Sequence, residues 1–509
     1  MICVAILIFG PACGNQRRDL DRSRPNIVIF YADDIGYGDV GCYGAIGVKT
    51  PNIDALAEKG IRFTDAHSSA ATCTPSRYSL LTGRYAFQNK DRVLSGKAPL
   101  IISIDTPTLP AMLQNAGYKT SVIGKWHLGL GNGTIDWNAI ISPGPLEIGF
   151  DYCFIIPATG DRVPCVFVEN HHVVNADPED PISVSYEDPI GDRPTGRSHP
   201  ELLKMKPSDT SHDRTIVNGV SRFGYMAGGE KALWVDEDFP FLLSQKAEKY
   251  IETYKDQSFF LFYSFHDIHV PRVIHPQFQG KSQMGPRGDA IVQVDWCVGE
   301  ILKILRRYNL EENTLIIFTS DNGPVLDDGY EDQAVELLGV HKPTGPFRGG
   351  KYSAFEAGTR VPFITYWPGV IQPEVCHSLM GQVDLFASLA ALTNQGLESG
   401  GALDSQNFMK TLLGKSTSGR EYLLEESYSF SLRYNNWKYI QPHKHVPFVD
   451  TVNIEGGYHL EPQLYDLSMD IGEQNNLAEE HPEIVRKLTD KLNKILRKQQ
   501  NSSRKTLEH

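Results

Sequence analysis

Four short segments of the chain are almost continuously apolar and rich in β-branched and aromatic residues. They are NIVIFY at 26–31, KTSVIG at 119–124, SFFLFYSF at 258–265 and NTLIIFTS at 313–320. Runs of this length and composition are typical of strands that are buried on both faces of a sheet. We therefore predict four such strands, with other structure packed on both sides of them.

Helical patterns separate these segments. Residues 50–60, TPNIDALAEKG, form a pattern that a glycine ends, and residues 287–310 form a longer one. The apolar stripe of the longer helix consists of Ile291, Val294, Val298, Ile301 and Leu305. Strands that alternate with helices predict an α/β fold in which helices cover both faces of a large, mixed and mostly parallel sheet.

Two further regions differ from this pattern. Residues 155–235 are rich in Pro, Gly, Asp and His and have poor periodicity, so we expect a long irregular excursion that forms a wall of a cleft. Beyond residue 400, EYLLEES, SFSLRYNNWKYI and PQLYDL predict short antiparallel strands, followed by a final helix with Ile484, Leu488, Leu492 and Ile495 on one face. We predict a large domain at 25–400 and a smaller α+β subdomain at 401–509.

The first residues carry an apolar run, MICVAILIFG, followed by small and then charged residues. This order is typical of a secretory signal rather than a membrane span, so we assign residues 1–24 to an export segment and linker. Cys13, after GPA, also resembles a bacterial lipoprotein cleavage site, at which the cysteine carries a lipid anchor. The expected location is the periplasm or the cell envelope.

Charge and cysteine content exclude several classes of protein. The 509 residues carry 49 Lys and Arg against 62 Asp and Glu, a net charge of −13, which argues against a nucleic acid as partner. Eight cysteines without a CxxC pair make neither a disulfide scaffold nor a thiolate zinc site. Cys153 and Cys165 could pair in an oxidising compartment.

Polar residues follow each of the four predicted strands. The sequences are ADD, KWH, HDIH and DNG, in chain order. Ligands of open α/β sheets bind beyond the carboxyl ends of the strands, so we expect the four clusters to meet in one cleft.

Asp33, Asp34, Asp321 and Asn322 offer only oxygen ligands, just beyond two strands that could be neighbours. A hard divalent cation such as Ca²⁺ or Mg²⁺ takes carboxylate and amide oxygens, whereas zinc prefers His or Cys. Each pair alone is also a common turn sequence. Together, at matching strand ends, they favour one bound metal ion.

Cys73 stands at the head of CTPSRYSLLTGRY, residues 73–85, beside polar rather than apolar neighbours. The segment predicts a helix, whose N-terminus attracts anions and would lower the pKa of a thiol. These features leave two interpretations open, a cysteine nucleophile or a modified residue beside an anion site.

The segment CTPSRYSLLTGR resembles the signature CxPSRxxLxTGR of the type I sulfatases, in which the cysteine is oxidised to Cα-formylglycine (3-oxoalanine). The resemblance continues from about residue 25 to 480. It includes NIVIFYADDIGYGDVGCYG, GYKTSVIGKWHLG, GFDYC, HDIHVPR, FTSDNGP, FRGGKYSAFEAGTRVPFI and LYDLSMDIGEQNNLA. It implies an alkaline-phosphatase-like fold, one Ca²⁺ per chain, and a partner enzyme that generates formylglycine from Cys73.

The resemblance also implies a mechanism. Hydrated formylglycine at position 73, itself a metal ligand, would attack sulfur with one hydroxyl and use the other to expel sulfate. Arg77 and Lys125 would orient it, and His127 would act as the base. His269 would act as the general acid and Lys351 would bind sulfate, with His266 as the competitor of His269 for the acid role.

Substrate recognition is expected from residues 160–181, GDRVPCVFVENHHVVNADPEDP. Candidate sugar-binding residues are Asp161, Arg162, Asn170, His171 and His172, together with His266 of the HDIH segment. HDIHVPR and DRVP are similar to bacterial carbohydrate sulfatases that remove 6-O-sulfate from galactose or N-acetylgalactosamine. A sulfated saccharide is therefore the expected substrate. The alternatives are a phosphonate or phosphate ester hydrolase of the same superfamily and an inactive glycan-binding homologue.

Overall fold

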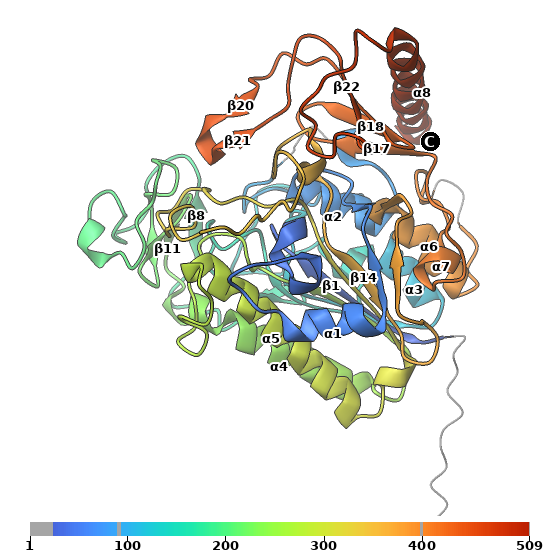
Figure 1. Ribbon diagram of the computed structural model, residues 1–509. Coiled ribbons are helices and arrows are strands. Elements are labelled where there is room, and N and C mark those ends of the chain that lie inside the picture. Colours follow the sequence, from blue (N-terminus) through green and yellow to red (C-terminus); the bar gives the residue numbers. More distant parts are fainter. Residues whose placement is uncertain (1–23, 89–92, 398–400, 508–509) are drawn as a thin grey trace, which may run out of the picture.

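The centre of the molecule is a ten-stranded sheet, seen in Figure 1, a computed structural model that describes residues 24–88, 93–397 and 401–507. Its strand order is β15-β2-β14-β13-β1-β12-β4-β5-β6-β7. The strands are β1 (Asn26–Ala32), β2 (Ile61–Phe63), β4 (Lys119–Lys125), β5 (Tyr152–Ile156), β6 (Val168–Glu169), β7 (His172–Val173), β12 (Phe259–Ser264), β13 (Thr314–Ser320), β14 (Phe363–Tyr366) and β15 (Glu374–Cys376).

The middle of this sheet is parallel. β13, β1, β12, β4 and β5 run in one direction, and antiparallel pairs join β14 to β13 and β6 to β5. The four predicted strands are therefore four adjacent strands of one sheet. The prediction of a mixed, mostly parallel sheet is confirmed.

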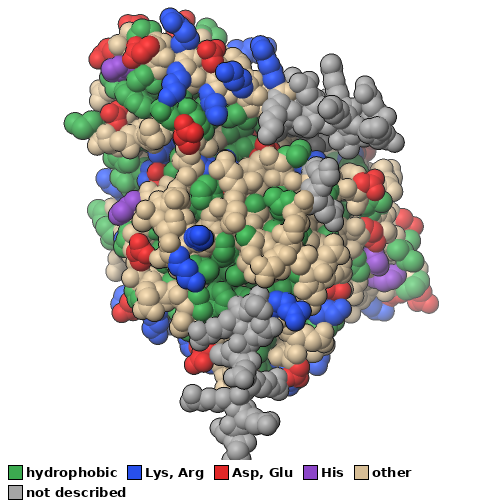
Figure 2. All heavy atoms as spheres, turned by 90° about the vertical axis from the view of Figure 1, so that its right-hand side faces the viewer, with side chains coloured by type: hydrophobic (Ala, Val, Ile, Leu, Met, Phe, Trp, Pro, Cys, Tyr) green, Lys and Arg blue, Asp and Glu red, His purple; other side chains and the backbone are tan. Residues whose placement is uncertain are grey.

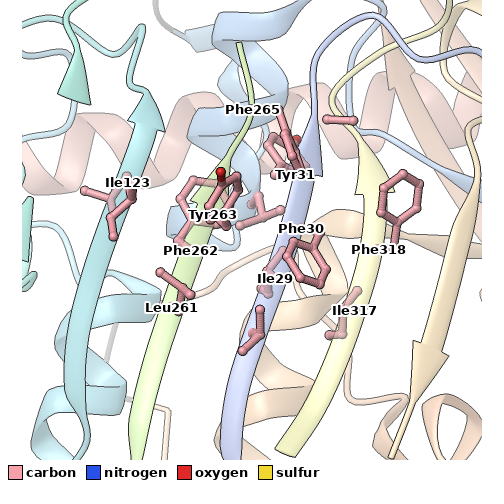
Figure 3. Close-up of a cluster of buried hydrophobic side chains, with 14 of the residues drawn as sticks. Ile29, Phe30, Tyr31, Ile123, Leu261, Phe262, Tyr263, Phe265, Ile317 and Phe318 are labelled. Carbon is pink, nitrogen blue, oxygen red and sulfur yellow. The ribbon is translucent and has the colours of Figure 1, made fainter. Parts of the chain in front are cut away.

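Large apolar side chains fill both faces of the central strands (Figure 3). Every residue of β1, β12 and β13 is buried, as expected for strands that helices cover on both sides. The ring centroid of Phe30 on β1 lies 6.0 Å from that of Tyr263 and 6.1 Å from that of Phe265. Neighbouring strands are thus held together by aromatic packing in addition to the backbone ladder.

Helices cover both faces of the sheet (Figure 1). On one face α5 (Gly285–Arg307) packs between α1 (Pro51–Lys59) and α4 (Phe239–Tyr254). On the other face lie α2 (Cys73–Thr82), α3 (Leu109–Asn115) and α6 (Leu385–Leu392). The predicted stripe of the longest of these helices is confirmed, because Ile291, Val294, Val298, Ile301 and Leu305 are all 0% exposed.

The region between β5 and α4 is irregular, as predicted. Its elements beyond β7 are β8 (Ser183–Ser185), β9 (Ile216–Val217), β10 (Val220–Ser221) and β11 (Tyr225–Ala227). A buried arginine ties the region together: Arg222 donates to both carboxylate oxygens of Asp236, at 2.7 and 2.9 Å, and to the carbonyl of Gly160 at 2.6 Å. The excursion is therefore folded back against the segment that follows β5.

The possible pairing of Cys153 with Cys165 is wrong, because both thiols are free. The Cys153 thiol on β5 donates to the carbonyl of Asn170 at 3.4 Å. Burial raises the pKa of each thiol to about 12, so both behave as inert packing groups.

A smaller antiparallel sheet follows in the chain, with strands β17 (Tyr422–Glu426), β18 (Phe430–Tyr434), β19 (Trp437–Ile440) and β22 (Gln463–Asp466). Helix α8 (Pro482–Leu507) packs Leu488 and Leu492 against it. The segment around α7 (Met409–Leu412) packs instead into the core of the large sheet, so the small sheet begins later than residue 401. The remaining short strands are β3 (Ala66–His67), β16 (Met380–Gly381), β20 (Phe448–Val449) and β21 (Ile454–Glu455).

Buried ion pairs join the two sheets. Arg433 on β18 donates to Glu356 at 2.7 Å and to Asp65 at 3.1 Å, and Lys438 on β19 pairs with Glu356 at 3.1 Å and with Glu425. Removing one partner of a buried pair leaves an uncompensated charge, at a cost of roughly 3–5 kcal/mol. These contacts therefore hold the small sheet behind the loop that contains Glu356.

The surface in Figure 2 carries Lys and Arg side chains interspersed with Asp and Glu side chains and with apolar ones. The charges on this face are therefore mixed rather than separated by sign. The predicted export segment and Cys13 lie outside the described residues. Within the described residues, none of the helices combines the length and the apolar character needed to cross a bilayer.

Replacing Phe30 by alanine tests the importance of the central strands. Phe30 is 0% exposed, so Phe30→Ala leaves a cavity between β1 and β12 and is expected to lower the free energy of unfolding by about 3–5 kcal/mol. Urea denaturation followed by fluorescence measures the change. Ile140→Ala is the control, since Ile140 is 68% exposed. An equal loss of unfolding free energy in both variants would contradict the assignment of Phe30 to the core.

Candidate active site

The carboxyl ends of four adjacent parallel strands form the floor of the site. Ala32 and Ser320 are paired at the ends of β1 and β13, so Asp33 and Asp321 leave the sheet side by side. Carboxylate oxygens of Asp33, Asp34 and Asp321 lie within 4.8 Å of one another, and all three residues are 0% exposed. The predicted convergence of the clusters after β1 and β13 is therefore what the structure shows.

The oxygen ligands are arranged as a cation site would need them. Oδ1 of Asp33 and Oδ1 of Asn322 are buried and have no hydrogen-bond partner. The Asn322 amide nitrogen donates to Asp34 at 2.7 Å, which leaves the amide oxygen open. Unpaired buried oxygens are costly unless something satisfies them, and a hard divalent cation does so. The residues present therefore fit Ca²⁺ or Mg²⁺.

Three basic side chains neutralise the three carboxylates. Lys125, the last residue of β4, donates to Asp33 at 2.5 Å, and Lys351 donates to Asp34 at 2.9 Å. Arg77 on α2 makes two hydrogen bonds to Asp321, at 2.7 and 3.0 Å. All of these side chains are buried, so their charges interact with little screening by water.

The two neighbouring carboxylates respond differently to this environment. Burial raises the pKa of Asp33 well above its ordinary value, and the charge of Asp321 acts in the same direction. Burial also disfavours the ionised form of Asp34, but Lys351 and Lys125 outweigh it and lower the pKa of Asp34. Asp34 also has a left-handed backbone, with φ of 61°, a conformation that costs energy and persists only where the surroundings enforce it.

Cys73 is the first residue of α2, as predicted, and is 2% exposed. Its Sγ lies 3.2 Å from Nδ1 of His127. The expectation that the helix N-terminus lowers the pKa of this thiol is wrong. Burial raises the pKa of Cys73 and outweighs the opposing charges of Lys125 and Lys351.

His127 follows β4 by two residues and turns its ring toward Cys73. Its Nε2 lies 2.9 Å from the carbonyl of Leu94, which can only accept, so Nε2 carries the proton. Nδ1 of the neutral ring therefore keeps its lone pair on the side of Cys73. Burial lowers the pKa of His127 well below its ordinary value, with Lys125 acting in the same direction, and this keeps the ring neutral.

The two histidines after β12 occupy different surroundings. Nδ1 of His269 donates to the carbonyl of Val270 at 2.7 Å, and Nε2 lies 4.0 Å from Asp34. Burial lowers the pKa of His269, and Lys351 adds to the effect. The ring of His266 packs edge-on against Phe239, with centroids 5.3 Å apart, and the residue does not line the cavity above Cys73.

Lys351 reaches the site from a glycine-rich loop without regular structure. Gly349 has φ of 86°, and a Cβ atom there would lie 2.3 Å from the hydroxyl of Ser353, so only glycine fits. The ammonium of Lys351 bridges Asp34, at 2.9 Å, and Asp328, at 3.0 Å. Burial favours its neutral form, but the carboxylates of Asp328 and Asp34 prevail and raise the pKa of Lys351.

A small cavity of about 50 Å³ opens above Cys73. Its lining brings together predicted residues from five separate parts of the chain. They are Cys73, His127, Asp161, Arg162, His269 and Lys351. Sequence reasoning did not find the other lining residues, Val93, His212, Asp328 and Tyr352.

The other substrate-binding candidates lie elsewhere, and their assignment to the site is corrected. Asn170 and His171 form the turn between β6 and β7, and His172 is the first residue of β7, at the outer edge of the sheet. His171 lies 2.8 Å from Glu147, and His172 is exposed to solvent. The exposure of this hairpin explains their polar side chains. The sequence alone does not distinguish exposed polar residues from residues that bind a sugar.

His212 comes from the irregular excursion, where no periodicity pointed to it. Its Nε2 lies 3.3 Å from Asp161 and its Nδ1 lies 2.9 Å from Asp209. Burial disfavours its charged form, but these two carboxylates outweigh burial and raise the pKa of His212 to about 9. Asp328 did offer a signal, because it belongs to the same post-strand turn, DNGPVLDD, as Asp321.

Comparison with known proteins agrees with this geometry. A family model described as Sulfatase matches residues 25–395. An N-acetylgalactosamine-6-O-sulfatase of Bacteroides thetaiotaomicron is 51% identical over 476 residues, 93% of each chain. Human arylsulfatase A is 32% identical over 492 residues, which cover 91% of this chain and 86% of that protein.

This chain is also similar to a solved structure along most of its length. It belongs to a 6S-sulfatase from a Bacteroides thetaiotaomicron locus for the metabolism of multiple glycosaminoglycans. It superposes with a TM-score of 0.92 at 51% identity, over 93% of this chain and 99% of that one. The match extends over nearly the whole chain. This chain therefore belongs to the sulfatase family and is a sulfuric ester hydrolase.

Proposed function

We propose that this chain removes a 6-O-sulfate group from a galactose or N-acetylgalactosamine residue of a glycan or oligosaccharide. The observation that carries the proposal is the position of Cys73, buried in a polar cavity beside His127 on the helix whose Arg77 binds Asp321 of the acidic cluster. The 6-O position is supported by the activity named for the 51% identical Bacteroides protein.

We propose that a formylglycine-generating enzyme converts Cys73 to formylglycine, whose hydrate supplies the nucleophile and a second hydroxyl for release of sulfate. The His127 ring is oriented to serve this position. Its Nδ1 lone pair faces residue 73, and its pKa is too low for the nitrogen to be blocked by a proton near neutral pH. Nδ1 can therefore accept a proton from a hydroxyl at residue 73.

The metal site is proposed to hold one Ca²⁺. Asp33, Asp34, Asp321, Asn322 and the oxidised side chain at position 73 would bind it, and it would supply positive charge next to the nucleophile and the sulfate oxygens. Without a cation, the carboxylates of Asp33, Asp34, Asp321 and Asp328 outnumber the three basic groups that they contact. The two positive charges of Ca²⁺ would offset the negative charge of an anionic sulfate ester.

The remaining basic groups are proposed to contact the substrate. Lys351 lines the cavity, and its ammonium group and that of the buried Lys125 would donate to sulfate oxygens, whereas Arg77 holds Asp321 in place. Nε2 of His269 is the atom of that ring directed away from its backbone hydrogen bond, so it would take up a proton beside the anionic sulfate ester and pass it to the leaving alcohol oxygen. The sugar ring would contact Arg162, whose position Asp161 fixes at 3.1 Å.

The rival functions differ in what they require. A phosphonate or phosphate ester hydrolase can share the same nucleophile, and substrate kinetics separates it from a sulfatase. An inactive glycan-binding homologue would not need the full set of Cys73, His127 and His269 around one cavity.

We further propose export through the apolar leader at residues 1–24, with Cys13 as a candidate anchor.

Cys73→Ala tests the nucleophile. The variant is expected to fold, because alanine fits the space of a buried thiol, and to lose hydrolysis of N-acetylgalactosamine 6-sulfate altogether. Peptide mass spectrometry across residue 73 of the wild-type protein should show the mass of an aldehyde in place of the thiol. Activity that survives in Cys73→Ala would overturn the assignment.

Chelation tests the metal. Removal of divalent ions is expected to abolish turnover and to lower the thermal midpoint, and Ca²⁺ should restore both, because a ligand that binds only the native state stabilises it. Asn322→Ala removes one orphaned oxygen, so its thermal midpoint should respond less to Ca²⁺. An identical Ca²⁺ response in the variant and the wild type would exclude Asn322 as a ligand.

His269→Ala and His266→Ala distinguish the two candidate acids. Loss of a general acid is expected to lower kcat for the sulfated sugar about 10²–10⁴-fold in His269→Ala. His266→Ala removes a ring packed on Phe239, so it should lower the thermal midpoint while kcat changes far less. Steady-state kinetics and thermal melts measure both, and the reverse ranking of kcat would transfer the acid role to His266.

A further inference from the structure

Lys351 and Tyr352 occupy the two central positions of a tight turn beside the cavity. The backbone N–H of Ser353 closes the turn by donating to the carbonyl of Gly350 at 3.0 Å. Tyr352 has φ of 71°, in the left-handed region. At the third residue of a turn this region favours glycine, because a Cβ atom there crowds the backbone. A tyrosine in this place keeps its conformation only where the surroundings enforce it.

Two hydrogen bonds hold the backbone of Tyr352 on either side of its Cα atom. Its N–H donates to the carbonyl of Ala71 at 2.8 Å, two residues before Cys73. Its carbonyl accepts from the hydroxyl of Tyr458, a residue that is 0% exposed. The first bond ties the turn to the segment that leads into α2, and the second ties it to the segment between β21 and β22.

The segment that contains Tyr458 runs beside the turn. The carbonyl of Gly456 accepts from the N–H of Ala354 at 2.8 Å. The carbonyl of Glu455 accepts from the hydroxyl of Ser353 at 2.7 Å. A Cβ atom at Gly456 would lie 2.6 Å from the ring of Tyr458, so this ring is packed closely against the backbone. The position of the Tyr458 hydroxyl is therefore fixed before it meets the turn.

The same hydroxyl fixes the aromatic surface next to the turn. It accepts from the backbone N–H of Tyr428 at 3.1 Å. The ring of Tyr428 is stacked on that of Tyr352, with centroids 6.1 Å apart and an interplanar angle of 9°. One oxygen atom of Tyr458 thus holds both the backbone of Tyr352 and the ring that packs against its side chain.

The ammonium group of Lys351 depends on this turn for its position. It lies 2.9 Å from Asp34 and 3.0 Å from Asp328. Both contacts require the Cα atom of Lys351 to stay where the turn places it, because the buried side chain has little freedom to compensate for a shift of the backbone. Rotation about the N–Cα bond of Tyr352 would move that Cα atom relative to the two carboxylates.

We propose that Tyr458 is a positioning residue for Lys351. Its hydroxyl holds the backbone of Tyr352 in the left-handed conformation and thereby keeps the ammonium group of Lys351 in place for a sulfate oxygen. This role rests on the proposed function, which assigns sulfate binding to Lys351. Tyr458 is not among the residues that line the cavity, so it acts through the turn rather than by contact with the substrate.

Tyr458→Phe removes this hydroxyl and keeps the ring. The measurements, on the matured and Ca²⁺-loaded protein, are the inhibition constants of inorganic sulfate and of N-acetylgalactosamine, with N-acetylgalactosamine 6-sulfate as substrate. We expect the constant for sulfate to rise about fivefold, as the loss of one hydrogen bond implies, and the constant for the sugar to stay the same. An unchanged constant for sulfate, or an equal rise in both constants, would overturn the proposal.

Tyr43→Phe is the matched control. The hydroxyl of Tyr43 also holds buried backbone, because it lies 2.8 Å from the carbonyl oxygens of Phe63 on β2 and Phe363 on β14. Tyr43 does not line the cavity, so this variant should lower the thermal midpoint and leave both inhibition constants at their wild-type values. If sulfate binding weakened as much in Tyr43→Phe as in Tyr458→Phe, the loss of any buried hydroxyl would have this effect and the specific role would be rejected.

Tyr352→Asn tests the route through the backbone. Asparagine adopts the left-handed region more readily than tyrosine, so residue 352 then needs the hydroxyl less to keep its conformation. In the Tyr352→Asn background, Tyr458→Phe is therefore expected to raise the inhibition constant of sulfate by less than about twofold, against about fivefold in the wild type. The same fivefold effect in both backgrounds would contradict the route through Tyr352.

The two proposals fail in different ways. A wild type that does not hydrolyse N-acetylgalactosamine 6-sulfate would refute the proposed function. Hydrolysis by the wild type, together with unchanged sulfate inhibition in Tyr458→Phe, would leave the function standing and reject the role of Tyr458.

Discussion

The balance of buried charge at the ends of β1 and β13 is the constraint on which the rest of the structure depends. Asp33, Asp34 and Asp321 are carboxylates without access to water, and their mutual repulsion must be offset inside the protein. Lys125, Arg77 and Lys351 supply the offset from β4, from α2 and from a loop. The sheet can end in three acidic residues only because these distant segments pack over it.

This constraint explains why so much of the fold serves one edge of the sheet. Arg77 donates to Asp321 and also to Ser264 at the end of β12, so it fixes the start of α2, and with it Cys73, above the strand ends. The small C-terminal sheet acts less directly. Its Arg433 and Lys438 pair with Glu356, in the same loop as Lys351, and so support that loop from behind.

The irregular excursion between β5 and α4 supplies a wall of the cavity that the sheet does not provide. It contributes Asp161, Arg162 and His212 to the lining of the cavity. Short strands, the buried Arg222–Asp236 pair and apolar residues that join the main core, such as Val166 and Trp234, fix its shape. The cavity is thus built from two structural layers, the strand ends below and the excursion beside them.

The sequence alone determined the four central strands, the carboxylate and amide side chains that meet after β1 and β13, and Cys73 at the start of a helix. These features follow from local patterns, because strand burial and post-strand turns are encoded within a few residues. Only the tertiary structure decided which polar residues of the excursion face the cavity. His171 and His172 resembled ligands but lie on an outer hairpin, whereas His212 gave no signal and lies between Asp161 and Asp209. The raised pKa of Cys73 also depends on the tertiary structure. Segments far apart in the chain bury this thiol, and no local sequence pattern predicts that burial.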